Sequence, residues 1–335
     1  MNSESLPEGE GLQLSIIIVS FNTREITAAC LNSIRDAGIR LGYEVLVVDN
    51  ASSDGSPEMI ERDFPEVSLI RNPENLMFAK ANNRAMRVAR GEQILLLNSD
   101  TLVHPGAVEA LFDFIRRAPE TTGCVGPRVL NRDGSIQSEG EAFDSYCYVI
   151  SSILGVEKLP LPGFIKDLLL PPGYPRRLTG CARKVGWVTG CCMMFPRKII
   201  GRVGDLDESF VFYCEEVEFC YRLKRHGFET WVVPEAQITH LGGASLMASK
   251  KMELLNQPEL PDYHARRFLL HQKTGGVRRK IRLNRLRILI FSAALPVVRL
   301  LRPSMVPQIV ERIEFHAGEN RRFIKELADQ PTIKN

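Results

Sequence analysis

The 335-residue sequence lacks several patterns by which nucleotide- and metal-binding proteins are usually recognised. No CxxC pair occurs among its eight cysteines, so a zinc knuckle is not expected, and the thiols are expected to be reduced in a cytoplasmic protein. The turn SFNTRE after the first apolar run contains no glycine, and no Walker-type lysine loop occurs, which argues against the usual dinucleotide and P-loop sites. No uninterrupted apolar run reaches about 18 residues, the length that a membrane-spanning helix needs.

Acidic residues are missing from a long stretch near the C-terminus. The net charge is only +3, but no Asp or Glu occurs between Asp262 and Glu311, and after Pro261 there are 16 Lys or Arg against 6 Asp or Glu. The segment RRKIRLNRLRILIFSAALPVVRLLRP is typical of a helix that lies in a bilayer interface, or else of a helical subdomain or a dimer contact. Nucleic-acid binding is the weaker interpretation because no aromatic stacking set accompanies the charge.

Alternating strand and helix patterns fill the first 130 residues. LSIIIVS (14–20), EVLVVDN (44–50) and ILLL (94–97) are apolar runs that predict buried parallel strands. Other expected elements are helices over about 24–37, 56–62, 79–89 and 105–117, strands over 67–70 and in TTGCVGP, and a strand with a glycine break over 185–195. This alternation predicts an α/β layer that binds its ligand at the carboxyl ends of the strands.

Seven motifs follow one another between residues 14 and 245: VSFNTRE, VVDNASSDGS, RNPENLMFAKANNRA, LLLNSD, WVTGCCMMF, FVFYCEEVEFCYRLKRHGFE and VPEAQITHLGGAS. In this set the sequence resembles the family-2 inverting glycosyltransferases, and most of all their rhamnosyltransferase-like group. The resemblance implies a GT-A fold with a Rossmann-like mixed sheet, a nucleotide-diphosphate sugar donor such as dTDP-rhamnose, Mg²⁺ or Mn²⁺, and inversion at the anomeric carbon. It also implies a glycan or polyprenyl-linked acceptor in cell-envelope polysaccharide synthesis.

The resemblance suggests a division of the chain. Residues 1–11 are expected to form a tail and 12–247 the GT-A domain, with a donor half (12–130) and an acceptor half (131–247). Residues 140–183 are rich in Pro and Leu without periodicity, which predicts a long loop that serves as a mobile lid or as a segment that touches a membrane. Residues 248–335 form the basic helical region, a candidate for contact with the inner face of the membrane or with a second copy.

Asp100 and His240 are the expected metal ligands. LLLNSD is a buried strand that runs into an acid, and its Asn98-Ser99-Asp100 stands where the family has an Asp-x-Asp metal motif. With one carboxylate in place of two, another ligand is needed, and the resemblance points to His240 in QITHLGG. The alternatives are a turn-capping aspartate and a structural histidine.

The acids in CEEVEF are the candidates for catalysis. A carboxylate within reach of the acceptor hydroxyl removes its proton as general base. The family mostly carries Glu-Asp here with the second acid as base, which maps to Glu216, with Glu215 in reserve. The alternative is an acidic helix start, favoured by the helix dipole, in a helix that ends at Gly227.

Polar residues after the first four strands are implied to bind the nucleotide: Ser20, Asn22, Asp49, Asn50, Arg71, Asn75, Asn82 and Ser99. Met77 stands where the family usually has glycine, so its side chain is expected to narrow the donor pocket or shift the loop. Trp187, Thr189 and Gly190 match the family's strand beneath the donor sugar and acceptor, although Trp187 would serve equally well in the core.

Two other classes of function stay open at this point. A catalytically degenerate transferase domain that binds a partner would account for Met77 and the Glu-Glu pair. A sugar-nucleotide pyrophosphorylase shares the layered architecture, but it would need a glycine-rich loop where SFNTRE stands.

Overall fold

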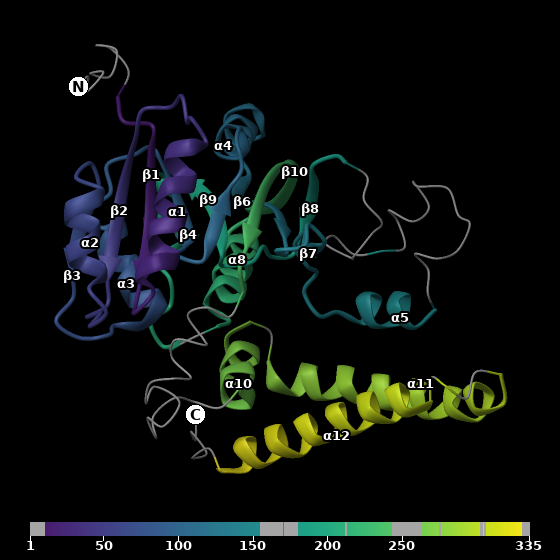
Figure 1. Ribbon diagram of the computed structural model, residues 1–335. Coiled ribbons are helices and arrows are strands. Elements are labelled where there is room, and N and C mark those ends of the chain that lie inside the picture. Colours follow the sequence, from purple (N-terminus) through teal and green to yellow (C-terminus); the bar gives the residue numbers. More distant parts are fainter. Residues whose placement is uncertain are drawn as a thin grey trace. The chain divides into compact units, whose positions relative to one another are not determined.

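The computed structural model contains a ten-stranded mixed sheet with helices on both of its faces (Figure 1). The structure describes residues 11–154, 170, 180–211, 213–242, 263–274, 276–301, 304 and 306–329. The chain divides into two compact units, one of residues 1–141 and 175–260 and the other of residues 142–174 and 261–335. The division at residue 247 stays a prediction.

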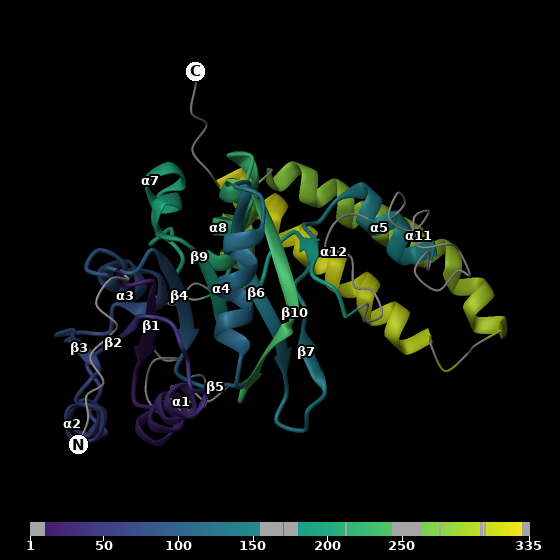
Figure 2. The same ribbon diagram turned by 90° about the horizontal axis from the view of Figure 1, so that it is seen from above.

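The sheet belongs to the first unit. Its strands are β1 (Leu14–Ser20), β2 (Tyr43–Asp49), β3 (Ser68–Arg71), β4 (Gln93–Asn98), β5 (Thr101–Val103), β6 (Thr122–Leu130), β7 (Ile136–Ser138), β8 (Arg183–Val185), β9 (Cys192–Pro196) and β10 (Glu229–His240). Their order is β3-β2-β1-β4-β9-β6-β10-β5, and Figure 2 shows the sheet from above. β7 pairs with β6, and β8 pairs with β10. The helices are α1 (Arg24–Asp36), α2 (Ser56–Asp63), α3 (Met77–Met86), α4 (Ala107–Arg117), α7 (Ile200–Val203) and α8 (Glu215–Arg225), with the 3₁₀ turn η2 (Arg197–Ile199).

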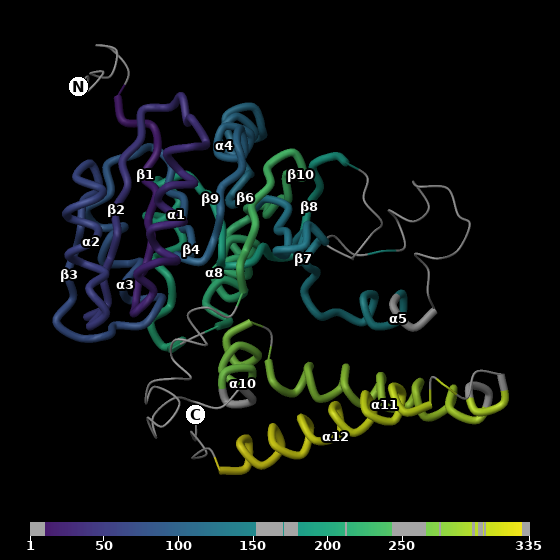
Figure 3. The backbone as a smooth tube through the Cα atoms, viewed as in Figure 1, coloured from purple at the N-terminus to yellow at the C-terminus, as the bar shows by residue number. Residues whose placement is uncertain are grey.

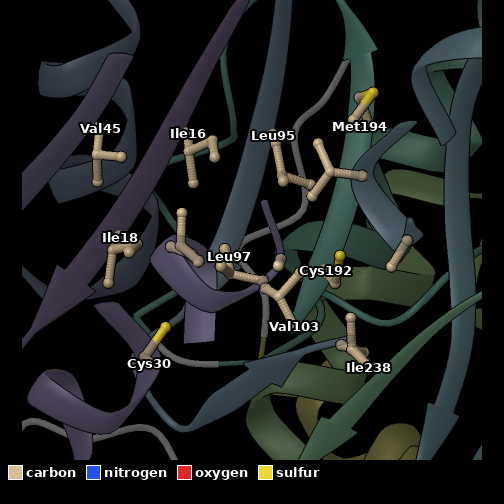
Figure 4. Close-up of a cluster of buried hydrophobic side chains, with 14 of the residues drawn as sticks. Ile16, Ile18, Cys30, Val45, Leu95, Leu97, Val103, Cys192, Met194 and Ile238 are labelled. Atoms are coloured by element: carbon tan, nitrogen blue, oxygen red, sulfur yellow. The ribbon is translucent and has the colours of Figure 1, made fainter. Parts of the chain in front are cut away.

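The core forms because the apolar runs are in register. Val45, Ile16, Leu95 and Met194 are paired positions on four neighbouring strands, so their side chains share one face of the sheet (Figure 4). Buried residues of α1, α2 and α4 cover this face. Each fully buried apolar side chain of this kind contributes roughly 1.5–3 kcal/mol.

The parallel strands define the edge where a ligand is expected. β1–β4 run parallel, and β6 and β10 share their direction because β9 is antiparallel to both β4 and β6. The carboxyl ends of these strands therefore meet at one edge of the sheet. The loops that carry most of the expected site residues all leave from this edge.

Two expectations about residues 140–195 were wrong. The run over 185–195 is not one strand with a break: β8 pairs with β10, β9 pairs with β4 and β6, and a loop separates them. An apolar pattern does not distinguish a buried loop from a buried strand. Within 140–183, residues Tyr146–Leu154 form helix α5 instead of a loop, and residues 155–169 and 171–179 lie outside the described part.

The second unit is helical. Besides α5 it contains α10 (Tyr263–Thr274), α11 (Val277–Leu301) and α12 (Val306–Asp329), and the two long helices lie side by side (Figure 3). The C-terminal region is thus helical, as expected. Among the described residues, no helix combines the length and the apolarity needed to cross a bilayer.

Charged side chains are buried inside this helical unit. Lys280 is 3% exposed and donates to Asp144, which also accepts from Arg287 at 2.8 Å. Glu319 is fully buried and accepts from Arg267 at 2.6 Å and from Asn284 at 2.7 Å. Opposite charges therefore compensate one another where α10, α11, α12 and the segment before α5 meet.

Candidate active site

A sharp turn explains why a buried strand runs into an acid. β4 ends at Asn98, and the hydroxyl of Thr101 donates to the Asn98 carbonyl at 2.7 Å. The chain then enters β5, which runs antiparallel to β10 so that Thr101 pairs with His240. The Asp100 carbonyl accepts from the backbone N–H of Leu241 at 2.8 Å. Asp100 and His240 are therefore brought together by the backbone.

Their side chains also meet. Nε2 of His240 lies 3.2 Å from Oδ1 of Asp100, and Nδ1 of His240 lies 3.0 Å from Oε1 of Gln137. The amide oxygen of Gln137 only accepts hydrogen bonds, so it favours a hydrogen on Nδ1 and leaves the Nε2 lone pair facing the carboxylate. Asp100 is 3% exposed, and its Oδ1 accepts no hydrogen bond from any residue that the structure describes.

This arrangement suits a divalent cation. A buried carboxylate oxygen and an imidazole nitrogen that face each other are both metal-ligand atoms, and a cation between them satisfies both. Gln137, which no sequence pattern singled out, orients the ring from behind as metal-bound histidines usually require. Across the described residues no group of three or more His, Cys, Asp or Glu could hold a metal, so Asp100 and His240 would supply only part of a coordination shell.

Glu216 lies in the first turn of α8. A methyl group added at Gly190 would stand 3.4 Å from Cβ of Glu216, so the two residues are neighbours. Burial raises the pKa of Glu216 to about 7, and the negative charge of Glu141 adds to this, although backbone N–H groups at the helix start act in the opposite direction. Its Oε2 is buried and accepts no hydrogen bond within the described part of the chain. A carboxyl group with such a pKa is suited to general-base work near neutral pH.

Asp100 and Glu216 both lie near Cys191. Burial raises the pKa of this thiol to about 12, and the charges of both Asp100 and Glu216 contribute to the shift. Its Sγ lies 3.0 Å from the hydroxyl of Thr189. Thr189 and Gly190 therefore lie beside the acids, as the sequence suggested, whereas Trp187 forms a backbone bridge with Glu141.

The loops after β1 and β2 are joined around Asp49. This residue is 2% exposed; its Oδ2 accepts from the Ser52 N–H at 2.9 Å, and its Oδ1 accepts no hydrogen bond from the described residues. The Asn22 N–H donates to the Ser52 hydroxyl at 2.9 Å, and Asn22 Oδ1 accepts from the Ser53 N–H at 2.8 Å. A buried acceptor is thus left available for a donor such as a base N–H or a ribose hydroxyl.

Asn50 and Asn75 both hold Met77. The side chain of Asn50 donates to the Met77 carbonyl at 3.3 Å, and Asn75 Oδ1 accepts from the Met77 N–H at 2.9 Å. Met77 has φ +61°, in the left-handed region that favours glycine, which explains physically why glycine suits this position. This protein nevertheless has methionine here, and hydrogen bonds to its N–H and to its carbonyl hold the strained backbone.

Four expected nucleotide residues do not join this cluster through their side chains. Ser20 contacts the hydroxyls of Thr23 and Thr27 and so fixes the start of α1. The other three lie elsewhere: Asn82 donates to the Phe78 carbonyl, Ser99 is buried in the turn after β4, and Arg71 pairs with Glu58 and Glu61 of α2. Their binding roles stay predictions.

Backbone strain marks the site more clearly than any single motif. In the described part of the chain the non-glycine residues with positive φ are Asn22, Ala51, Met77, Tyr213 and Cys214. Asn22 and Ala51 lie in the loops after β1 and β2, Met77 is the first residue of α3, and the last two directly precede Glu215 and Glu216. Such conformations cost about 1–3 kcal/mol each and cluster at functional sites. Only the unusual methionine could have been noticed in the sequence beforehand.

A mixed sheet of this order, with an acid at the turn after its fourth strand and a helix that presents further acids beside it, defines the GT-A class of nucleotide-sugar transferases. A crystal structure of GalNAc-T7 with UDP, GalNAc and Mn²⁺ superposes with a TM-score of 0.53 at 18% identity, over 69% of this chain and 43% of that one. This likeness establishes the GT-A fold.

The chain belongs to glycosyl transferase family 2, whose family model matches residues 15–204. An N-acetylglucosaminyl-diphospho-decaprenol L-rhamnosyltransferase of Mycobacterium tuberculosis is 30% identical over 208 residues, which are 58% of this chain and 66% of that protein. The low-salt glycan biosynthesis hexosyltransferase Agl10 of Haloferax volcanii is 28% identical over 63% of this chain and 62% of that protein. The chain is therefore a member of family 2 with similarity to an L-rhamnosyltransferase, and it spans just under two thirds of the length of these relatives.

Proposed function

We propose that the protein transfers a sugar from a nucleotide diphosphate to an acceptor hydroxyl, with inversion at the anomeric carbon. The observation that carries this proposal is the buried carboxylate oxygen of Asp100, which lies 3.2 Å from Nε2 of His240 in the same locality as Glu216. Asp49 and the joined loops after β1 and β2 would hold the nucleoside. L-rhamnose on dTDP is the first donor to test, because a relative of M. tuberculosis is named an L-rhamnosyltransferase.

Asp100 and His240 would hold Mg²⁺ or Mn²⁺ together with the donor diphosphate. A cation bound there would neutralise negative charge on the phosphates as the leaving group departs. The turn between β4 and β5 fixes the backbone around Asp100, and Gln137 orients the ring of His240.

Glu216 would remove the proton from the acceptor hydroxyl as the oxygen attacks. The new bond forms from that oxygen to the anomeric carbon, and the bond from the anomeric carbon to the phosphate oxygen breaks. Burial favours the neutral acid and so makes the Glu216 carboxylate a better proton acceptor than an exposed glutamate. Gly190 leaves room beside it because it carries no side chain.

The helical unit supports a lipid-linked acceptor. Exposed positions on α11 recur every three or four residues and form one face, which we call the outer row: Arg278, Arg282, Arg285, Leu289, Ser292, Ala293, Pro296, Arg299 and Leu300. Leu289 is 67% and Leu300 83% exposed, and no acid occurs anywhere on α11. We propose that this row rests on anionic headgroups at the cytoplasmic face of the membrane, where a polyprenyl-linked glycan would be presented.

Turnover of the purified full chain tests the proposed chemistry. Nucleoside diphosphate release is measured with dTDP-rhamnose and a panel of other sugar nucleotides, with Mn²⁺ or with excess chelator. Removal of the cation is expected to stop turnover. Asp100→Asn and Glu216→Gln are each expected to lower kcat roughly 100-fold or more.

Two exposed acids provide matched controls. Asp113→Asn and Glu235→Gln remove the same charges from exposed positions and should keep full activity. If Asp100→Asn and Glu216→Gln turn over as fast as these controls, the assigned roles are wrong. If no sugar nucleotide binds, as calorimetry with Mn²⁺ would show, a degenerate binding domain becomes the better explanation.

A further inference from the structure

A chain of side-chain hydrogen bonds runs from α3 to the strained turn in front of it. Arg84 Nη1 donates to Asn72 Oδ1, and Asn72 Nδ2 donates to Asn50 Oδ1 at 2.7 Å. Asn50 Nδ2 then donates to the Met77 carbonyl at 3.3 Å. The backbone N–H of Asn72 also donates to the Asp49 carbonyl at 2.8 Å. Asn72 is 4% and Asn50 2% exposed, so water does not easily replace the bond between these two side chains, whereas Arg84 reaches Asn72 from an exposed position on α3.

The last member of the chain has an unfavourable backbone. Met77 has φ +61°, and a residue with a Cβ keeps this conformation only where its surroundings force it to do so. Its N–H donates to Asn75 within the same turn, and its carbonyl, the first of α3, accepts from the Asn50 side chain. Asn50 in turn has its amide oriented by Asn72, because a donor on Asn72 selects the Asn50 oxygen.

We propose that Asn72 and Arg84 are positioning residues of the donor pocket. They orient Asn50, and Asn50 holds Met77 in the left-handed turn, so the pocket beside Asp49 keeps a fixed width. The inference rests on the proposed function, since it takes the loops after β2 and β3 as the site of the nucleotide sugar. It extends that function by naming two residues, outside the motif positions expected to touch the donor, that determine how well the donor fits.

The variant Met77→Gly distinguishes a positioning role of Arg84 from a purely structural role. Glycine adopts positive φ readily, so Met77→Gly removes the strain that the hydrogen-bond chain offsets. Loss of Arg84 should therefore matter much less in the glycine background. A purely structural role would cost the same in both backgrounds, because Arg84 and Asn72 would still lose the same bond.

The experiment is a double-mutant cycle on the full chain, read by calorimetry with dTDP, UDP and GDP in the presence of Mn²⁺. Arg84→Met is expected to weaken the binding of the diphosphate preferred by the unmodified enzyme roughly tenfold, and Met77→Gly should reduce that loss to about twofold. Arg87→Met is the matched control, because Arg87 is 65% exposed on its side chain and pairs only loosely with Asp205 and Glu208, at 3.6 and 3.7 Å.

Asn72→Asp provides a second, milder route to the same result. Aspartate still accepts the hydrogen bond from Arg84 but has no donor for Asn50, so the binding of the nucleoside diphosphate should weaken as in Arg84→Met. Arg84→Lys should retain part of the affinity. Thermal unfolding of each variant shows whether it is folded, and if Arg84→Met does not fold, Asn72→Asp decides. Equal losses with methionine and with glycine at position 77, or no loss in Asn72→Asp, refute the inference alone. Absence of binding by the unmodified enzyme refutes the proposed function and this inference with it.

Discussion

At the scale of single residues, the site consists of acids whose charges are costly to bury. Asp49, Asp100 and Glu216 each have a buried oxygen that accepts no hydrogen bond from the described residues. An unsatisfied buried acceptor costs about 1–3 kcal/mol, so three of them at one edge of a sheet are not expected of a merely structural arrangement. Each becomes satisfied if a ligand brings a donor or a cation.

Glu216 gives the enzyme a predicted dependence on pH. Its pKa is raised to about 7, so the carboxyl is largely protonated at acidic pH and largely ionised at alkaline pH. Because the base acts in its ionised form, kcat should rise with pH and level off above about 7 to 8. The pH–rate profile of the purified enzyme checks this.

The variant Glu141→Gln sharpens the pH test. Glu141 contributes to the raised pKa through its negative charge, so removing that charge should move the midpoint of the profile to lower pH. The exposed control Glu235→Gln should leave the midpoint in place. A midpoint that does not move in Glu141→Gln would contradict the assignment of the profile to Glu216.

At the scale of helices and strands, the apolar runs predicted the first four strands along the chain. The expected strands over 14–20, 44–50 and 94–97 correspond to β1, β2 and β4, because a parallel strand buried on both faces has a continuous β-branched or leucine-rich sequence. The acid after β4 and the histidine at the end of β10 were also expected to lie close together, and the structure places them 3.2 Å apart.

The remaining features depend on long-range packing, which sequence patterns do not report. The loop between β8 and β9 is as apolar as a strand because it is largely covered and lies beside Glu216, so the run over 185–195 produced a false strand. Gln137 has ordinary neighbours in the sequence and gains its role only through its contact with the distant His240, and the bond from Arg84 to Asn72 likewise appears only in the fold. The left-handed conformation of Met77 is likewise set by its hydrogen-bond partners, and not by its own preference.

The contact between Asp144, which precedes α5, and α11 leads to a prediction about stability. Lys280 is buried and depends on Asp144 and, more distantly, on Glu319 at 3.9 Å. Asp144→Ala leaves a buried ammonium short of a partner, which should lower the free energy of unfolding by about 3–5 kcal/mol. Urea unfolding measures this loss, and the added change Lys280→Met should restore much of it.

The two tryptophans make that measurement specific. Trp187 and Trp231 both belong to the unit of the sheet, whereas the long helices belong to the other unit. Asp144→Ala should therefore shift the far-ultraviolet dichroism transition more than the tryptophan fluorescence transition. Equal stability of Asp144→Ala and the unmodified protein would show that the buried ion pair is not needed.

At the scale of the whole molecule, charge is unevenly distributed along the chain. The outer row of α11 carries four arginines and two exposed leucines on a helix without acids. Each arginine near an anionic surface contributes about 1 kcal/mol, so the three at positions 278, 282 and 285 would together contribute about 3 kcal/mol. This is enough for salt-sensitive, reversible binding.

Co-sedimentation with vesicles tests the membrane contact. The full chain should bind vesicles that contain phosphatidylglycerol and not vesicles of phosphatidylcholine alone, and the triple change of Arg278, Arg282 and Arg285 to Gln should weaken binding roughly 100-fold. Changing three basic residues of α12 to Gln removes the same charge and should have a smaller effect; the three are Arg321, Arg322 and Lys325. If both triple variants bind alike, only net charge matters; if neither vesicle is bound and the chain forms dimers, α11 is a protein contact.

The turn after β4 has a consequence for any shortened form of the chain. The family match ends at residue 204, before both Glu216 and His240. During synthesis on the ribosome, Asp100 therefore emerges long before its imidazole partner, and the last sheet strand must pair with β5 before the two meet. A polypeptide that ends at residue 204 would keep Asp49 and Asp100 but lack Glu216 and His240, and we expect it to have no transferase activity.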